Sequence, residues 1–431
     1  MKKILFFVLL AATLGAGART WTLDECVDYA IEHNINVLSR KLNVREGELG
    51  VTEAKDRFLP QLQGYGSQSF NFGRGLTANN TYANRNTSSF SVGANLSLPL
   101  FQGLRAVRQL SYSRSALQAQ LEEVEVAKDD VTLNVISQYL QALYASEMLQ
   151  VARINLGISQ AELERRQALL DAGRLPGLDI HEARSQVAQD ELSVTNAEND
   201  SIIARLDLAQ LLNLPSADDF DIAPLPDEDR LLPSADDVFA NALQYNHTMR
   251  AGQLQLDAAE KNVAVAKSGY IPTLSFSAGI GTNYYKTSGY DNEGFGAQMR
   301  HNFAKSIGFS LSVPIFDAFS TRNSVRRARV QQESLRLQLD DSRNRLYKAI
   351  VQAYTQATGA VKKQESARIA VESSLAAFEA MKIKYDNGRA NATEFQKAQS
   401  TYINSEAQAV QAKYERILRA RILDFYNTTT L

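Results

Sequence analysis

The chain has 431 residues, with 46 lysines and arginines against 48 aspartates and glutamates, and a single cysteine. A formal net charge of −2 gives no electrostatic footprint for nucleic acid, and one cysteine excludes an internal disulfide and a cysteine-cluster metal site. Nine prolines in this length are fewer than half the usual ~5%, which permits long helices.

The first residues are typical of a secretory leader. Two lysines are followed by apolar residues 4–10 and by the small-residue cleavage sequence Ala-Gly-Ala at 16–18. We therefore predict a signal peptide over 1–18; a short buried helix is the alternative. Cys26 follows two acidic residues rather than small ones, so we expect it on the buried face of the first helix and without a lipid anchor.

The rest of the chain repeats its plan once. Three short segments recur in the same order at offsets of 212 or 215 residues: 58–60 as 270–272, 98–101 as 313–316, and 171–174 as 386–389. Three ordered matches indicate a duplication. We predict a first structural repeat over 19–213, a proline- and aspartate-rich surface linker over 214–235, and a second repeat over 236–431.

Two long segments without proline, 104–172 and 319–386, dominate the repeats. Their apolar residues recur at a spacing of seven, which predicts helices that supercoil around their neighbours, each about 100 Å long. Four further helical segments have about half that length: 24–58, 179–212, 236–270 and 394–426. We expect two of these to stack end to end beside each long helix, so that the chain supplies four helical columns.

Each repeat also contains two segments in which apolar and small polar residues alternate. These are 62–72, 89–100, 273–280 and 306–315, arranged as hairpins over about 62–100 and 273–315. A period of two predicts strands, and an apolar face opposite a small-polar face is the pattern of a transmembrane β-barrel. A β-sandwich with one wet face is the alternative. The polar stretches 73–88 and 286–305 predict solvent-facing hairpin loops.

Four strands cannot span a bilayer by themselves, because both edges of the sheet would expose unpaired backbone groups to lipid. The chain is therefore expected to form an oligomer. Two copies would supply 8 strands, a barrel filled by its own side chains, whereas three would supply 12 and leave an aqueous lumen. This arithmetic favours a trimer but does not exclude other orders.

Several short motifs occur in order along 20–426. They are Trp21–Glu25 with Ala30 and Asn34, Leu59–Pro60, Leu98–Phe101, Gly173 with Leu178–Asp179, and Tyr385, Gly388 and Glu394. In their order and duplication these motifs resemble the TolC-like outer-membrane efflux family. The resemblance implies a fold that is mainly α with a transmembrane β-barrel part: a trimeric 12-stranded β-barrel continuous with a 12-helix α-barrel.

The resemblance also implies a function. The chain would be the outer-membrane channel, or exit duct, of a tripartite efflux or type I secretion system, with its α-helical part in the periplasm. Its partners would be two further copies, outer-membrane lipid, a periplasmic adaptor and an inner-membrane transporter that delivers the substrate. The alternative is a non-channel periplasmic coiled-coil adaptor or a structural envelope protein, neither of which needs four alternating strands.

The resemblance places two sets of functional residues at the turns between helices. The adaptor-contact tip comprises Gly173, Arg174, Leu175, Leu178, Gly388 and Arg389. Tyr385 and Glu394 match the positions of the periplasmic gate, and Asp386 is an adjacent candidate for it. Glycine is also the residue that suits the left-handed position after a helix. Glu394 and Lys397, three residues apart, equally fit a solvated contact on one helix face.

No catalytic constellation is expected. The four histidines match no zinc-binding spacing, and the sequence contains neither a G-x-S-x-G motif nor a P-loop. We therefore predict no enzyme activity, no metal and no cofactor. The class of exported substrate is not encoded in any of these motifs.

The adaptor assignment predicts that Leu178→Asp abolishes export while the trimer still assembles, because a buried carboxylate would disrupt an apolar contact with the adaptor. Export assays in whole cells, with trimer assembly followed on native gels, test this. Normal export by the variant would contradict the assignment.

Overall fold

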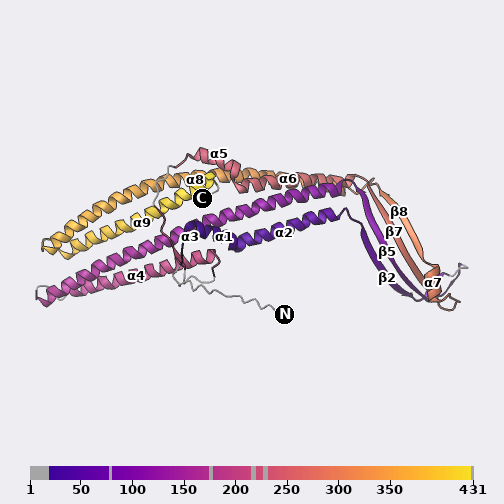
Figure 1. Ribbon diagram of the computed structural model, residues 1–431, viewed down its shortest axis with the longest axis horizontal. Coiled ribbons are helices and arrows are strands. Elements are labelled where there is room, and N and C mark those ends of the chain that lie inside the picture. The colour runs from indigo at the N-terminus through magenta and orange to yellow at the C-terminus, as the bar shows by residue number, and fades with distance from the viewer. Residues whose placement is uncertain (1–18, 77–79, 174–177, 215–219, 227–231, 429–431) are drawn as a thin grey trace, which may run out of the picture. The chain divides into compact units, whose positions relative to one another are not determined.

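The computed structural model describes residues 19–76, 80–173, 178–214, 220–226 and 232–428 (Figure 1). Its elements are β1 (Arg19–Trp21), α1 (Leu23–His33), α2 (Ile35–Asp56), β2 (Gln61–Asn71), β3 (Arg74–Leu76), β4 (Tyr82–Asn84), β5 (Thr87–Gln102), α3 (Arg105–Asp171), α4 (Leu178–Leu211), β6 (Phe220–Ile222), α5 (Ala235–Tyr245), α6 (His247–Lys267), η1 (Ser268–Tyr270), β7 (Thr273–Thr287), α7 (Phe295–His301), β8 (Ala304–Ser312), α8 (Ser320–Asp386) and α9 (Ala392–Thr428). The predicted signal peptide lies outside the described residues. Among the described helices, none has an apolar stretch long enough to cross a membrane.

The chain forms two compact units that do not coincide with the two sequence repeats. The helical unit contains the described residues of Met1–Lys41, Val124–His247 and Ser342–Leu431. The strand unit contains Leu42–Glu123 and Thr248–Asp341, apart from residues outside the described ranges. Each unit therefore draws on both repeats, and the long helices α3 and α8 contribute to both.

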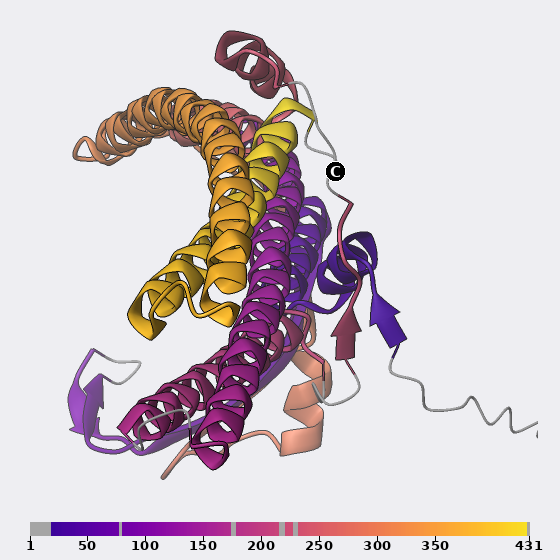
Figure 2. The ribbon, with the colours of Figure 1, turned by 90° about the vertical axis from the view of Figure 1, so that its left-hand side faces the viewer.

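The prediction of two long helices is confirmed. Helices α3 and α8 have 67 residues each. Within the helical unit, α4 lies along α3 and α9 lies along α8 in both ribbon views (Figure 1, Figure 2). Val135 and Ala142 of the predicted seven-residue series are buried, whereas Leu121 is 42% exposed in the single chain.

The two shorter helices expected over 24–58 and 236–270 are each broken at an asparagine. Asn34 is extended (φ −66°, ψ 131°), and Asn246 has nearly the same backbone (φ −65°, ψ 119°). The Asn34 side chain accepts from the Asn36 backbone N–H at 2.9 Å and donates to the Leu211 carbonyl at 3.2 Å. Asparagine side chains compete in this way with the helical ladder, which accounts for the break at Asn34.

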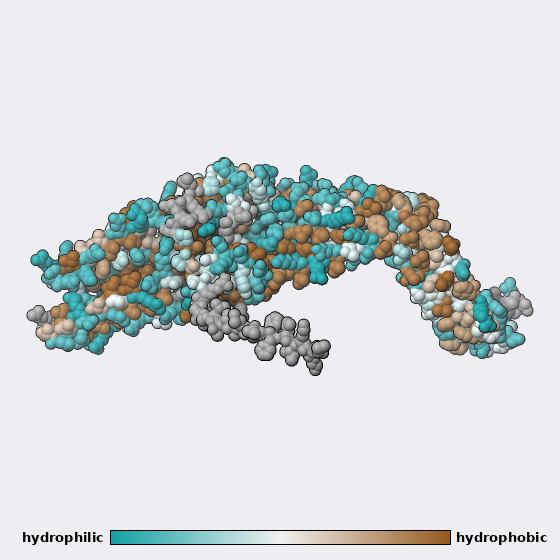
Figure 3. All heavy atoms as spheres, in the orientation of Figure 1, coloured by the Kyte–Doolittle hydropathy of each residue, from teal (hydrophilic) through white to brown (hydrophobic). Residues whose placement is uncertain are grey.

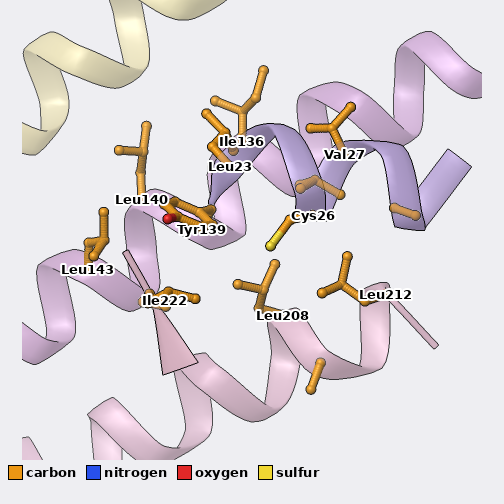
Figure 4. Close-up of a cluster of buried hydrophobic side chains, with 14 of the residues drawn as sticks. Leu23, Cys26, Val27, Ile136, Tyr139, Leu140, Leu143, Leu208, Leu212 and Ile222 are labelled. Carbon is orange, nitrogen blue, oxygen red and sulfur yellow. The ribbon is translucent and has the colours of Figure 1, made fainter. Parts of the chain in front are cut away.

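A cluster of buried apolar side chains joins α1, α3, α4 and β6 in the helical unit (Figure 4). Cys26 lies in it with no exposed surface, as predicted. Burial, with a smaller contribution from Glu25, raises the pKa of its thiol to about 12. The thiol is therefore protonated and inert at neutral pH.

The predicted surface linker contains a buried strand. Within 214–235, Phe220–Ile222 form β6, which pairs in parallel with β1, and Phe220 is only 4% exposed. The hydroxyl of Tyr139 on α3 donates to the carbonyl oxygens of Ala223 (2.6 Å) and Trp21 (3.1 Å). A buried tyrosine therefore fastens this small sheet to the long helix.

The four predicted strands form one antiparallel sheet in the order β2-β5-β7-β8. Strand β8 ends at Ser312, before the predicted 315, because its partner β7 begins at Thr273, the residue that pairs with Ser312. Apolar side chains gather over the sheet in the space-filling view (Figure 3). The sheet has two open edges, on β2 and on β8.

The two predicted hairpin loops contain short elements. Strands β3 and β4 pair with each other inside 73–88, and α7 lies inside 286–305. Helix α7 covers the part of the β7 edge that extends beyond β8. Gln298 of α7 accepts from the Tyr285 N–H at 2.9 Å and donates to the Tyr285 carbonyl at 3.0 Å. Asn292 makes the same pair of bonds to Thr287.

Tyr139→Phe should lower the free energy of unfolding of the helical unit by about 1 kcal/mol, because the Ala223 carbonyl loses its hydroxyl donor. Thermal unfolding of the detergent-solubilised protein, followed by circular dichroism, measures the shift. Tyr29→Phe, which keeps the ring contacts with Trp21 and His33, is the control. An equal midpoint for the two variants would contradict the role of the Tyr139 hydroxyl.

Candidate functional site

The candidate site begins at the two turns that join the long helices to their partners. Gly173 and Gly388 both have left-handed backbones (φ +72° and +68°). The Gly388 N–H donates to the Tyr385 carbonyl at 3.0 Å, and the Arg389 N–H donates to the Lys384 carbonyl at 2.8 Å. This is a Schellman motif, so Gly388 ends α8 for a conformational reason.

The other predicted tip residues are placed only in part. Arg174 and Leu175 lie outside the described residues, and Leu178 is the first residue of α4. Arg389 is exposed. Of the predicted tip residues, Gly388 and Arg389 therefore lie in one described turn, directly after α8.

A charged cluster next to these turns joins α8 to α3. The Tyr385 hydroxyl donates to Oε1 of Glu162 at 2.6 Å. Glu162 also accepts from Arg165 Nε at 2.9 Å and from Arg166 Nε at 2.7 Å. Arg166 in turn donates to the Asp179 carbonyl in the first turn of α4 at 3.1 Å. The Glu162 carboxylate therefore accepts hydrogen bonds from side chains on two helices, α3 and α8.

Aromatic contacts surround this hydrogen bond. The Arg165 guanidinium lies 4.1 Å from the centre of the Tyr385 ring, in cation–π geometry. The ring also stacks on Phe395 of α9, with centres 4.8 Å apart. Phe395 is 5% exposed and also contacts Phe378 of α8. The phenol ring is therefore packed between side chains of α3 and α9.

The cluster changes the acidity of its members. Burial alone would raise the pKa of the Glu162 carboxyl, but hydrogen bonds from Arg165, Tyr385 and Arg166 outweigh it and hold that pKa below the ordinary value. Burial and the bond to Glu162 raise the pKa of the Tyr385 hydroxyl. At neutral pH the pair is therefore a phenol donating to a carboxylate.

A second polar cluster joins α9 to α3 and α4. Asp190, 5% exposed, accepts from Asn155 at 2.8 Å, from Gln186 at 3.1 Å and from the Ser159 hydroxyl. Gln399 of α9 donates to Asn155 at 2.9 Å. The α9 helix is thus tied to the other two through amide groups.

The remaining gate candidates lie at helix ends. Glu394 forms a capping box with Asn391: its carboxylate accepts from the Asn391 N–H at 3.0 Å, and its own N–H donates to Asn391 Oδ1 at 2.8 Å. This capping box stabilises the N-terminus of α9. Asp386 is the exposed last residue of α8. Of the three predicted gate residues, only Tyr385 lies in the charged cluster.

The sequence prediction missed Glu162, Arg165 and Arg166. Arg165 and Arg166 follow Glu162 by three and four residues, which places all three on one face of the helix. This spacing is the sequence signal that could have identified them. Nothing in the sequence pairs them with Tyr385, which lies more than 200 residues further along the chain. The sequence Asn-Ala-Thr-Glu at 391–394 was a recognisable capping signal.

Comparison of the sequence with known proteins finds relatives that match nearly the whole chain. The sequence profile of the family described as "Outer membrane efflux protein" matches residues 26–214 and 238–425. The chain is 24% identical over 430 residues to outer membrane protein TolC of Vibrio cholerae, covering 97% of this chain and 93% of that protein. It is 22% identical over 419 residues to outer membrane efflux protein BepC of Brucella suis, covering 96% and 88%.

Solved structures show the same fold. The CmeC outer membrane channel of Campylobacter jejuni matches with a TM-score of 0.78 at 16% identity, covering 94% of this chain and 85% of that one. The open state of the MtrE outer membrane channel of Neisseria gonorrhoeae matches with a TM-score of 0.75 at 19% identity, covering 94% and 88%.

Proposed function

We propose that this chain, which belongs to the outer membrane efflux protein family, is held shut at its periplasmic end by the hydrogen bond between Tyr385 and Glu162. The chain is an outer-membrane channel of an efflux or secretion system, with its helical part in the periplasm. Its relatives are channel proteins rather than enzymes. Channels of this family work as trimers with a periplasmic adaptor and an inner-membrane pump.

Three copies of the sheet close the barrel in this proposal. Strands β2 and β8 are the open edges of the sheet, and β8 of one copy pairs with β2 of the next. Every backbone group at the edges then has a partner, as lipid requires. A barrel of 12 strands leaves room for an aqueous lumen.

We call the Tyr385–Glu162 hydrogen bond the latch, because in this proposal it holds the gate closed. The 2.6 Å contact carries the proposal, because it is a charge-assisted bond between two helices that belong to different repeats. Opening requires α8 to move away from α3, which leaves Glu162 with Arg165 and Arg166 on its own helix. The carboxylate therefore never loses all its partners, so the cost of opening is small.

The second polar cluster is a further tie between the same helices. Gln399 contacts Asn155 on α3, and Gln396 donates to Gln186 on α4 at 2.6 Å. These amide bonds add to the latch, and they also break when α9 moves away from α3 and α4.

The turn residues serve the adaptor in this proposal. Arg389 is exposed just after the left-handed Gly388, so its guanidinium is available to a partner. Gly173, Arg174, Leu175 and Leu178, at the corresponding place in the sequence between α3 and α4, are assigned the same role. The glycines shape the turns, and Arg174, Leu175, Leu178 and Arg389 provide the contact.

The acidic gate residues act on ions near the threefold axis. Glu394 combines its capping role with an exposed position, and Asp386 is exposed at the preceding helix end. Three copies of each would form rings that attract cations. The cations come from solution, since the chain itself is proposed to bind no resident metal.

Tyr385→Phe should raise the single-channel conductance in planar bilayers several-fold, because the ring contacts stay while the latch bond is lost. Tyr402→Phe, whose ring stacks on Phe378 in the same aromatic row, is the matched control and should conduct like the unmodified chain. Equal conductance for Tyr385→Phe and the control would refute the latch.

The latch also predicts how conductance depends on pH. Only the Tyr385 bond among the causes that lower the pKa of Glu162 is lost on opening, so this part of the lowering favours the closed state while Glu162 is ionised and is lost as the pH falls through the lowered pKa. Conductance should therefore rise on acidification through that pKa. The raised pKa of Tyr385 keeps the donor protonated at neutral and mildly alkaline pH.

Glu162→Gln separates this effect from general acid unfolding. The variant has no carboxylate to titrate, so its conductance should already be high at neutral pH and should not rise on acidification. An acid-induced rise of the same size in this variant would show that another group is responsible.

A further inference from the structure

The two places where the sheet passes into the long helices expose apolar side chains. Between Pro99 and Phe101 the pairing of β5 with β7 shifts, which places Phe101 opposite Leu274. Leu274 shares the apolar face of β7 with Phe276, because side chains alternate along a strand. The shift therefore keeps Phe101 on the apolar face of the sheet, just before α3 begins.

Both junctions also have the same uncommon backbone. Gly103 and Leu104 precede α3 with φ values of +61° and +63°, and Ala318 and Phe319 precede α8 with +50° and +64°. The two pairs are 215 residues apart, which is the offset of the sequence repeat. Bulky residues rarely adopt this left-handed conformation, yet the second residue of each pair is large and apolar. Leu104 is 48% and Phe319 is 50% exposed, and for Leu104 this is not due to an open sheet edge, because it follows the inner strand β5.

The segments around these apolar side chains are strongly basic. Residues 100–121 contain three arginines and no acid, and residues 313–332 contain four arginines and one aspartate. Arg322, Arg326 and Arg329 are exposed, and their spacing of four and three residues places them on one face of α8. Within the part of the chain that the structure describes, none of these three arginines forms an ion pair.

The rest of the two long helices has no such excess of arginine. Residues 122–171 contain four bases and nine acids, and residues 333–386 contain nine bases and seven acids. Several of these bases are paired within their own helix, as Arg166 is with Glu162 and Arg368 with Glu365. The uncompensated positive charge is therefore concentrated where the helices meet the sheet.

Phe319 connects the apolar and the basic parts of this region. Its ring packs edge-on against Phe316, with centres 5.4 Å apart, and Phe316 is 74% exposed. The Arg322 guanidinium lies 4.0 Å from the centre of the Phe319 ring, in cation–π geometry. The carboxylate of Asp317 accepts from the Thr321 N–H at 2.7 Å, so the one acid of the segment stabilises the first turn of α8. Arg322 is thus held against an exposed aromatic pair.

We infer that this junction surface, formed by Leu104, Phe316, Phe319, Arg322, Arg326 and Arg329, binds acidic phospholipids of the periplasmic leaflet of the outer membrane. The inference rests on the proposed trimeric barrel, in which the apolar face of the sheet contacts lipid. Because the helical part lies in the periplasm, the end of the sheet that joins the helices is at the periplasmic leaflet. The apolar side chains then lie among the acyl chains, and the arginines reach the lipid phosphates.

Charge complementarity identifies the ligand. A guanidinium group binds phosphate oxygens through two parallel hydrogen bonds, and basic residues beside a membrane favour lipids with a net negative charge. An electrically neutral lipid offers the same acyl chains and a phosphate, but no net charge. The surface should therefore prefer phosphatidylglycerol to phosphatidylethanolamine.

Native mass spectrometry of the full-length trimer tests this preference. The protein is equilibrated with mixed micelles that contain equal amounts of phosphatidylglycerol and phosphatidylethanolamine, and the lipids retained per trimer are counted. The unmodified chain should retain several-fold more phosphatidylglycerol than phosphatidylethanolamine. The double variant Arg322→Gln, Arg326→Gln should lose the preference. Arg322→Lys combined with Arg326→Lys should keep most of it, because the positive charges remain.

Arg336→Gln is the matched control. Arg336 is exposed and lies on the same side of α8 as Arg322, but about 20 Å further along the helix, which is beyond the reach of a headgroup. This variant should retain phosphatidylglycerol like the unmodified chain. A second measurement does not depend on the arginine variants. The added fluorescence of Phe319→Trp should be quenched by phosphatidylglycerol brominated on its acyl chains, whereas the single native tryptophan, Trp21, lies in the helical unit.

Three results would overturn the inference. Equal retention of the two lipids by the unmodified chain would show that headgroup charge is not recognised. Retention of phosphatidylglycerol by the double glutamine variant at the level of the control would show that other residues bind it. A Phe319→Trp signal that brominated lipid leaves unchanged would place this side chain outside the bilayer. Failure of the underlying barrel is recognised separately, because the unmodified chain would then not migrate as a trimer on native gels.

Discussion

The open edges of strands β2 and β8 are the constraint on which the proposed assembly depends. A four-stranded sheet with an apolar face belongs in lipid, where every unpaired N–H and C=O costs several kcal/mol. The chain closes one exposed edge internally, since Gln298 and Asn292 bond the part of β7 that extends past β8. Within the described part of the chain nothing comparable covers β2, whose eleven residues are all exposed. The edges that remain open, on β2 and β8, are the ones through which identical copies of the sheet can pair with one another.

The two predicted repeats share their long helices and turns, but the proposed latch occurs only once. At the offset of 215 residues that relates the two turns, Leu170 stands at the position of Tyr385, and Ala377 stands at the position of Glu162. The two halves share long helices and left-handed glycines because those features follow from repeated helix and turn signals. The latch needs one residue from each half. The duplicated halves therefore had to diverge before α8 could be fastened to α3.

The sequence predicted the elements that depend on local periodicity and missed those that depend on distant contacts. Long proline-free heptads predicted α3 and α8, and strict alternation predicted β5 within a few residues. The breaks at Asn34 and Asn246 were missed because the surrounding helical pattern is continuous. Strand β6 was missed because three residues carry no period, and only pairing with β1 defines it. Glu162 was missed for the same reason, since its partner Tyr385 is adjacent only in the folded chain.

The helical unit joins its helices by two kinds of contact, and the difference matters for gating. Around Cys26 and Tyr139 the contacts are apolar and buried, so separating them would expose apolar surface at about 25 cal/mol per Å². Between α3, α8 and α9 near the turns, many contacts are hydrogen bonds of Glu162, Asp190 and Gln399. Water can replace these bonds at little net cost. In the proposed gate, the bonds of α3 with α8 and α9 that break on opening are thus ones that water can replace, whereas the apolar cluster around Cys26 stays closed.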